Sequence, residues 1–150
     1  MQITSRNKSI FLADDDTDDC LIFGEALKAL NEGVELTITY DGVQLLSTLD
    51  ETVPPPPYVI FLDLNMPRKN GFEALSEIRR NDKFKDIPVV ILSTASNPDI
   101  IEKTFHLGAN YFVRKPSTFS QLSEAIKTVL SLDLTQLHTQ PERQKFVLSA

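Results

Sequence analysis

Short apolar runs alternate along the chain with longer segments whose apolar residues recur every three or four positions. The short runs cover residues 9–13, 34–40, 58–62, 88–92 and 110–113. Three of them are apolar at nearly every position, which is typical of strands covered on both faces of a sheet. The run at 34–40 alternates more, so we predict that this strand lies nearer an edge.

The longer segments have helical spacing and carry helix boundary signals. They cover residues 18–30, 43–49, 72–78, 99–107 and 118–132. Asn97 and Pro98 predict the start of the fourth helix, Gly108 its end, and Ser117 or Thr118 the cap of the fifth. Five β-α units in this order, joined by right-handed crossovers, predict an α/β fold with a doubly wound, parallel, five-stranded sheet.

Length, charge and composition limit the class of protein. The 150 residues predict one domain at 1–132 and a C-terminal extension at 133–150 that is too short for an output domain. A net charge of -6 argues against nucleic acid or an anionic membrane as partner. The first nine residues lack a signal-peptide pattern, no apolar run is long enough to span a membrane, and the single cysteine, Cys20, fits a reducing compartment. We therefore expect a cytoplasmic protein.

Two smaller features each allow a functional and a purely structural interpretation. The prolines at 54–57 could bind an SH3-like groove, but so short a run favours a stiff loop between helix and strand. His106 and His138 lie at neither phosphotransfer nor ligand spacing, so we interpret them as a helix residue and a tail residue.

Polar side chains follow four of the predicted strands. They are three carboxylates, a hydroxyl and an ammonium, carried by Asp14, Asp15, Asp63, Ser93 and Lys115. Ligands bind at the carboxyl edge of an open α/β sheet, so we expect these groups to converge there. Asp16, Asp18 and Asp19 also follow the first strand, and we interpret them as helix caps or a solvated first turn.

Carboxylates that converge in this way need a cation. Two of them 4 Å apart repel each other by about 4 kcal/mol at an effective dielectric near 20. Mg²⁺ binds through carboxylate oxygens and phosphate, and the lack of a nearby His or Cys argues against zinc. A carboxylate beside such a metal is a plausible nucleophile toward phosphorus, with Lys115 stabilising the transferred charge.

The motifs resemble the response-regulator receiver family of two-component signalling. The matching segments are IFLADDD, VIFLDLNMPRKNG, IPVVILST and LGANYFVRKP, and the resemblance covers residues 9–132. Thirty residues separate Asp63 from Ser93 and 22 separate Ser93 from Lys115, as in that family. The resemblance implies a flavodoxin-like receiver fold, and it is nearest to stand-alone receivers, including those that partner bacterial phytochromes.

The resemblance also implies a role for each site residue. Asp63 is the expected phosphoacceptor; Asp14, Asp15, Asp63 and the backbone carbonyl of Asn65 are the expected ligands of Mg²⁺ or Mn²⁺. Ser93 and Lys115 are expected to bind the phosphoryl oxygens. Asn65, Thr94 and Ala95 are expected to tune the reaction.

The implied partners are a sensor histidine kinase or histidine phosphotransfer protein, and a downstream protein on the face of helix 4, strand 5 and helix 5. Ser93 and Phe112 are expected to switch that face, with Phe112 where many members carry Tyr. A homodimer is possible. The resemblance implies no enzyme activity beyond self-catalysed phosphorylation and autodephosphorylation.

Two other classes of protein compete with this interpretation. A pseudo-receiver would bind partners without phosphorylation, but the complete set of acids and lysine disfavours it. A nucleotide-binding enzyme would need a glycine-rich phosphate loop, and no such motif is present. An aspartyl-phosphate hydrolase would carry its nucleophile after the first strand and would need insertions that this chain lacks.

Overall fold

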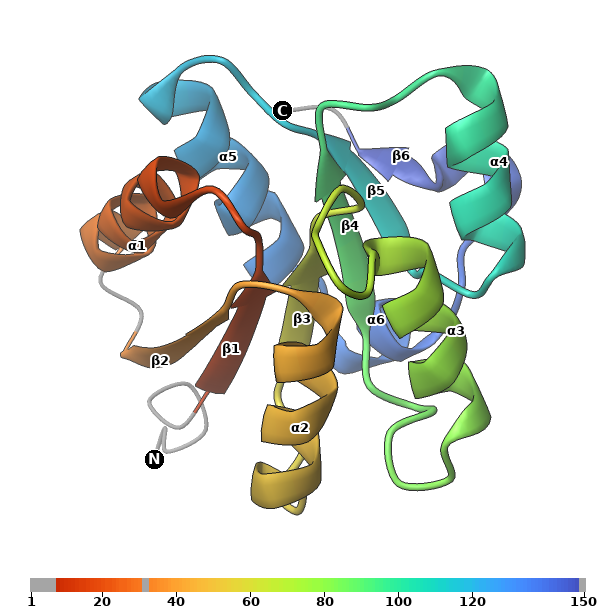
Figure 1. Cartoon of the computed structure of the whole chain (residues 1–150). Coiled ribbons are helices and arrows are strands. Elements are labelled where there is room, and N and C mark those ends of the chain that lie inside the picture. The colour runs from red at the N-terminus through yellow and green to blue at the C-terminus, as the bar shows by residue number, and fades with distance from the viewer. Residues whose placement is uncertain (1–7, 31–32, 149–150) are drawn as a thin grey trace.

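A six-stranded parallel sheet forms the centre of the computed structural model, which describes residues 8–30 and 33–148 (Figure 1). The strands are β1 (Lys8–Ala13), β2 (Val34–Thr39), β3 (Val59–Leu62), β4 (Val89–Ser93), β5 (Tyr111–Arg114) and β6 (Val147–Leu148). Their order in the sheet is β2-β1-β3-β4-β5-β6. The doubly wound order is confirmed, and β2 lies at an edge as its alternating pattern predicted.

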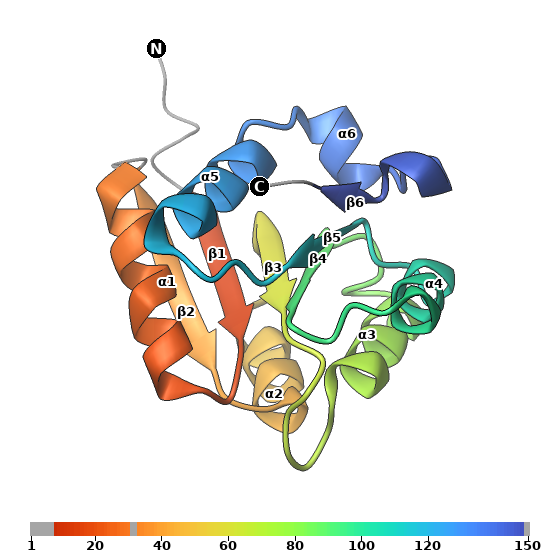
Figure 2. The ribbon, with the colours of Figure 1, turned by 90° about the horizontal axis from the view of Figure 1, so that it is seen from above.

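Helices cover both faces of the sheet (Figure 2). They are α1 (Thr17–Leu30), α2 (Gly42–Thr52), α3 (Gly71–Arg80), α4 (Pro98–His106), α5 (Phe119–Leu130) and the short α6 (Leu134–His138). Helices α1 and α5 pack on one face, and α2, α3 and α4 on the other. Successive residues of β1, β3 and β4 enter opposite cores, which explains their continuous apolar runs.

Local signals begin and end the helices as predicted. The side chains of Asn97 and Thr118 accept hydrogen bonds from backbone N–H groups in the first turns of α4 and α5. Gly108, with φ of +101°, follows α4 in the left-handed region that favours glycine. Residues 54–57 form a connection between α2 and β3, and Cys20 is buried.

The sixth strand corrects the prediction of five. It comes from the segment predicted as a C-terminal extension, which forms α6, a 3-10 turn at Arg143–Lys145 and β6. Leu137 enters the core under α1 and α5, while Phe146 enters the core under α4. The segment therefore wraps around the β5 edge of the sheet. Its strand is only two residues long, too short for a sequence pattern to reveal.

Residues 1–7, which hold most of the segment searched for a signal peptide, lie outside the described residues. Within 8–30 and 33–148, no helix has the length and apolar character needed to cross a membrane.

Candidate functional site

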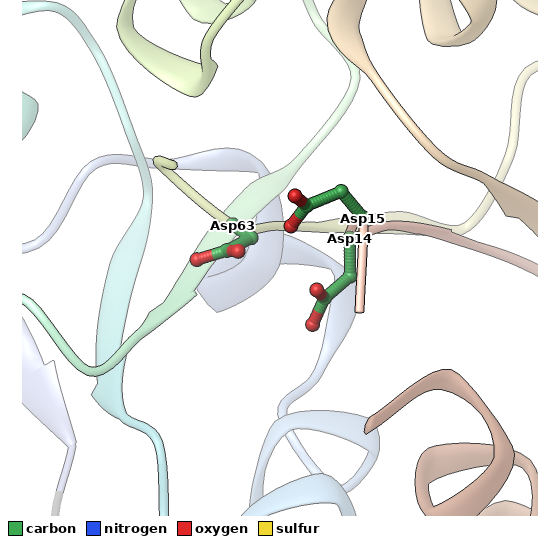
Figure 3. Close-up of side chains that lie close together, drawn as sticks. All are labelled: Asp14, Asp15 and Asp63. Carbon is green, nitrogen blue, oxygen red and sulfur yellow. The ribbon is translucent and has the colours of Figure 1, made fainter. Parts of the chain in front are cut away.

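Three carboxylates meet at the carboxyl edge of the sheet (Figure 3). Asp14 and Asp15 follow β1, and Asp63 follows the adjacent strand β3, whose Leu62 is in register with Ala13. Each offers an oxygen that lies within 4.8 Å of the others. Asp14 and Asp63 are buried, whereas Asp15 is exposed. The predicted convergence of the acids is therefore present.

Backbone contacts hold these acids in place. The N–H of Asp63 donates to the carbonyl of Ala13 at 2.9 Å. The Asp63 Oδ1 atom accepts from the N–H of Leu64, also at 2.9 Å. The start of α3 lies close to the backbone of Asp63. A Cβ added at Gly71 would lie only 2.3 Å from the Asp63 carbonyl oxygen. Glycine at 71 thus allows the loop after β3 to return tightly to the site.

Lys115 brings a positive charge to the acids from the end of β5. Its N–H donates to the Ser93 carbonyl at 2.9 Å, which fixes the backbone. Its Nζ atom lies 2.8 Å from Asp14 Oδ2 and 4.0 Å from Asp63 Oδ2. The ammonium also lies 2.8 Å from Asp19 Oδ2. Asp19 lies in the first turn of α1 with its side chain 39% exposed, as the sequence indicated, but no spacing rule in the sequence marked it as a partner of the lysine.

Burial and neighbouring charges oppose each other at the site. Burial raises the pKa of Asp63 to about 6, with Asp14 adding to the rise and Lys115 opposing it. Burial alone would lower the pKa of Lys115, but hydrogen bonds to Asp14 and Asp19 outweigh it, so that pKa is raised. The lysine therefore stays charged, while Asp63 is held in an environment that disfavours its ionised form.

The donor set fits a hard divalent cation. All three converging groups are carboxylates, and Mg²⁺ and Mn²⁺ prefer oxygen ligands. Asp15 and the loop that follows β3, which includes Asn65, line an open hollow of about 460 Å³. A cation here would favour the ionised form of Asp63, because an opposite charge within a few ångströms lowers the pKa of a carboxyl group.

The comparison with known families agrees with this geometry. Residues 10–127 match the family model described as the response regulator receiver domain. The chain belongs to this family. It is therefore a receiver domain of two-component signalling, and receiver domains are in general signalling modules rather than enzymes.

Two relatives show how far the similarity extends. Rcp1 of Synechocystis sp. is 34% identical over 128 residues, which are 83% of this chain and 87% of that protein. The Mn²⁺-bound crystal structure of Rcp1 has a TM-score of 0.74 at 33% identity, covering 90% of this chain and 99% of that one. The phosphorylated cyanobacterial phytochrome response regulator RcpA has a TM-score of 0.78 at 33% identity, with coverage of 91% and 99%.

The hydroxyl predicted to bind phosphate lies at the end of β4 in this receiver. Ser93 is fully buried, and its Oγ atom accepts from the N–H of Ala95 at 3.2 Å. In the described part of the chain it makes no hydrogen bond to Asp63. Thr94 is exposed and lines a hollow that also reaches Asp14 and Lys115. The roles of Ser93, Thr94 and Ala95 remain predictions.

Phe112 is already buried within the receiver. Its ring packs edge-on against that of Phe146, with centroids 6.3 Å apart, and its N–H donates to the Phe146 carbonyl at 3.0 Å. Phe146 in turn packs on Phe105 of α4, with centroids 5.1 Å apart. The C-terminal segment therefore contacts both α4 and β5, which the sequence did not predict.

A second feature that the sequence did not reveal holds the loop after β3. Arg68 lies in the left-handed region with φ of +64°, and its guanidinium forms an ion pair with Asp41. Asp41 is buried, caps α2 through the N–H of Gln44 at 2.8 Å, and has its pKa lowered by that hydrogen bond and by Arg68. The N–H of Gly42 also donates to the Lys69 carbonyl. These contacts tie the loop that carries Asn65 to the start of α2.

Proposed function

We propose that Asp63 accepts a phosphoryl group from a sensor histidine kinase or a histidine phosphotransfer protein. The convergence of three carboxylates with one ammonium is the observation that carries this proposal. The Mn²⁺ described for Rcp1 and the phosphorylation described for RcpA support it by similarity. The relay operates in the cytoplasm, where the unpaired Cys20 stays reduced.

The transfer exchanges one bond for another. A carboxylate oxygen of Asp63 attacks the phosphorus and forms an O–P bond, while the P–N bond of the donor phosphohistidine breaks and its electron pair stays on the imidazole. Mg²⁺ or Mn²⁺, held by Asp14, Asp15, Asp63 and the Asn65 carbonyl, supplies charge neutralisation when bound. Lys115 pairs with a phosphoryl oxygen, and the Ser93 hydroxyl donates to another. Hydrolysis of the acyl phosphate returns the receiver to its starting state.

The output surface is the face of α4, β5 and α5. Movement of Ser93 toward the phosphoryl oxygens alters the packing beside Phe112, which lies on the neighbouring strand. The C-terminal segment already covers part of this face through Phe146 and through an ion pair between Arg143 and Glu102 at 2.9 Å. A downstream protein therefore contacts the uncovered part or displaces the segment. A second receiver that forms a dimer through this face likewise contacts the uncovered part or displaces the segment.

Phosphorylation with acetyl phosphate tests the proposal. Wild-type protein and Asp63→Asn are incubated with acetyl phosphate in Mg²⁺ or in EDTA, and intact mass is measured. We expect one added phosphoryl group on wild-type protein in Mg²⁺, and none in EDTA or on Asp63→Asn. Asp82→Asn, at a side chain that is 95% exposed, is the control for loss of one carboxylate. Absence of Asp63-dependent modification of the wild type would refute the proposal.

A further inference from the structure

Two carboxylates share the Lys115 ammonium. Asp14 Oδ2 and Asp19 Oδ2 each lie 2.8 Å from Nζ. Asp63 Oδ2 lies at 4.0 Å, beyond hydrogen-bond distance. The ammonium has three N–H donors, so two of them are engaged by acids other than the phosphoacceptor. The ammonium therefore lies nearer to Asp14 and Asp19 than to Asp63.

Asp14 and Asp19, the two partners of Lys115, differ in their other roles. Asp14 belongs to the group of carboxylates that can hold a metal ion, and Asp19 does not. Asp19 comes from the first turn of α1, and its side chain is 39% exposed where that of Asp14 is 3%. Its carboxylate can thus be neutralised without removing a candidate metal ligand.

We propose that Asp19 is a positioning residue that restrains the Lys115 ammonium and thereby lowers the affinity of the site for a phosphoryl group. The inference rests on the proposed function of Asp63. When the phosphoryl oxygens arrive, one N–H of Lys115 is not engaged by Asp14 or Asp19, and the contact with Asp19 opposes movement of the ammonium toward these oxygens. The negative charge of Asp19 also repels an anionic group on Asp63. The Oδ2 atoms of the two residues lie no farther apart than the sum of their distances to Nζ.

The size of the effect follows from Coulomb's law with screening. A unit charge at such a distance changes anion affinity by more than tenfold at an effective dielectric near 20. The Asp19 side chain is more than a third exposed, so solvent and salt screen its charge and reduce this change in affinity. We expect Asp19→Asn to tighten the binding of a phosphoryl analogue about threefold to tenfold.

Beryllofluoride binding in saturating Mg²⁺ measures this affinity. Wild-type protein and variants are titrated with beryllofluoride and followed by amide NMR, since the chain contains no tryptophan for fluorescence. Asp18→Asn is the matched control, because Asp18 lies next to Asp19 in the same helical turn, is exposed, and forms no ion pair within the described residues. We expect it to match the wild type, and Asp19→Glu to restore wild-type affinity.

Mg²⁺ affinity measured without beryllofluoride separates positioning from structural damage. Damage to the site would weaken both Mg²⁺ and beryllofluoride binding. Loss of the Asp19 charge instead strengthens beryllofluoride binding while it weakens Mg²⁺ binding about threefold to tenfold, because the same charge repels the anion and attracts the cation. Equal beryllofluoride affinity in Asp19→Asn and Asp18→Asn, or weaker binding in Asp19→Asn, would overturn the inference alone. Failure of the wild type to bind beryllofluoride in an Asp63-dependent manner would overturn the proposed function as well.

Discussion

Replacement of Asp63 by asparagine in the metal-free protein measures the free-energy cost of the buried carboxylate. Burial raises the pKa of Asp63 from its ordinary value of 3.8 to about 6, so the ionised form is less favourable in the folded than in the unfolded chain. One pKa unit corresponds to about 1.4 kcal/mol, and the shift therefore costs roughly 3 kcal/mol of unfolding free energy near pH 8. Asparagine has the same shape and no charge, so Asp63→Asn removes this cost.

The sign of the pH dependence follows from proton binding. Below pH 3.8 the carboxyl is protonated in both the folded and the unfolded chain, and the cost is absent. Between 3.8 and about 6 the folded chain binds more protons, so wild-type stability falls as pH rises. Above that range the full cost applies. The advantage of Asp63→Asn is therefore small near pH 4 and largest at neutral and alkaline pH.

Urea denaturation followed by circular dichroism in EDTA provides the assay. Wild-type protein, Asp63→Asn and the exposed-site control Asp82→Asn are compared at several pH values, about 4.5 to about 8. Added Mg²⁺ should stabilise the wild type more than Asp63→Asn, because the cation offsets the repulsion that the variant lacks. A stability difference that is independent of pH, or a wild type more stable than the variant at pH 8 in EDTA, would refute the reasoning.

Two further substitutions test contacts that hold elements of the fold together. Arg79 donates to the carbonyls of Gly108 and Ile87, both at 2.9 Å, and to Asn110 Oδ1 at 2.8 Å. Lysine cannot make these three hydrogen bonds at once, so Arg79→Lys should lower the unfolding free energy by about 2 kcal/mol. Arg80→Lys, in the same helix, is the control and should change the unfolding free energy little. Equal effects of the two substitutions in urea denaturation would contradict the prediction. Phe146→Ala should lower the unfolding free energy by about 3 kcal/mol and speed hydrogen exchange of the Phe112 amide, which donates to the Phe146 carbonyl. Unchanged exchange would show that the Phe146 ring does not hold the C-terminal segment in place.

The sequence by itself determined the doubly wound parallel fold, most helix boundaries and the placement of the acids and Lys115 at one edge of the sheet. Strands covered on both faces must be apolar throughout, so their runs stand out without knowledge of neighbours. Parallel strands with right-handed crossovers place all their carboxyl ends at one edge. Residues that directly follow strands, such as Asp63 and Lys115, are therefore placed at the same edge by topology alone. The caps at Asn97 and Thr118 are equally local.

Only the tertiary structure decided the contacts made across elements. Asp19 reaches Lys115 because of how α1 is rotated and how it packs against α5, which no single-segment pattern encodes. The pairing of Asp41 with Arg68 joins two loops, and Phe146 reaches Phe112 through a two-residue strand. Such contacts depend on the relative placement of segments far apart in the chain. A hydrophobic period within one segment records which face of it is buried, but it does not record which partner covers that face.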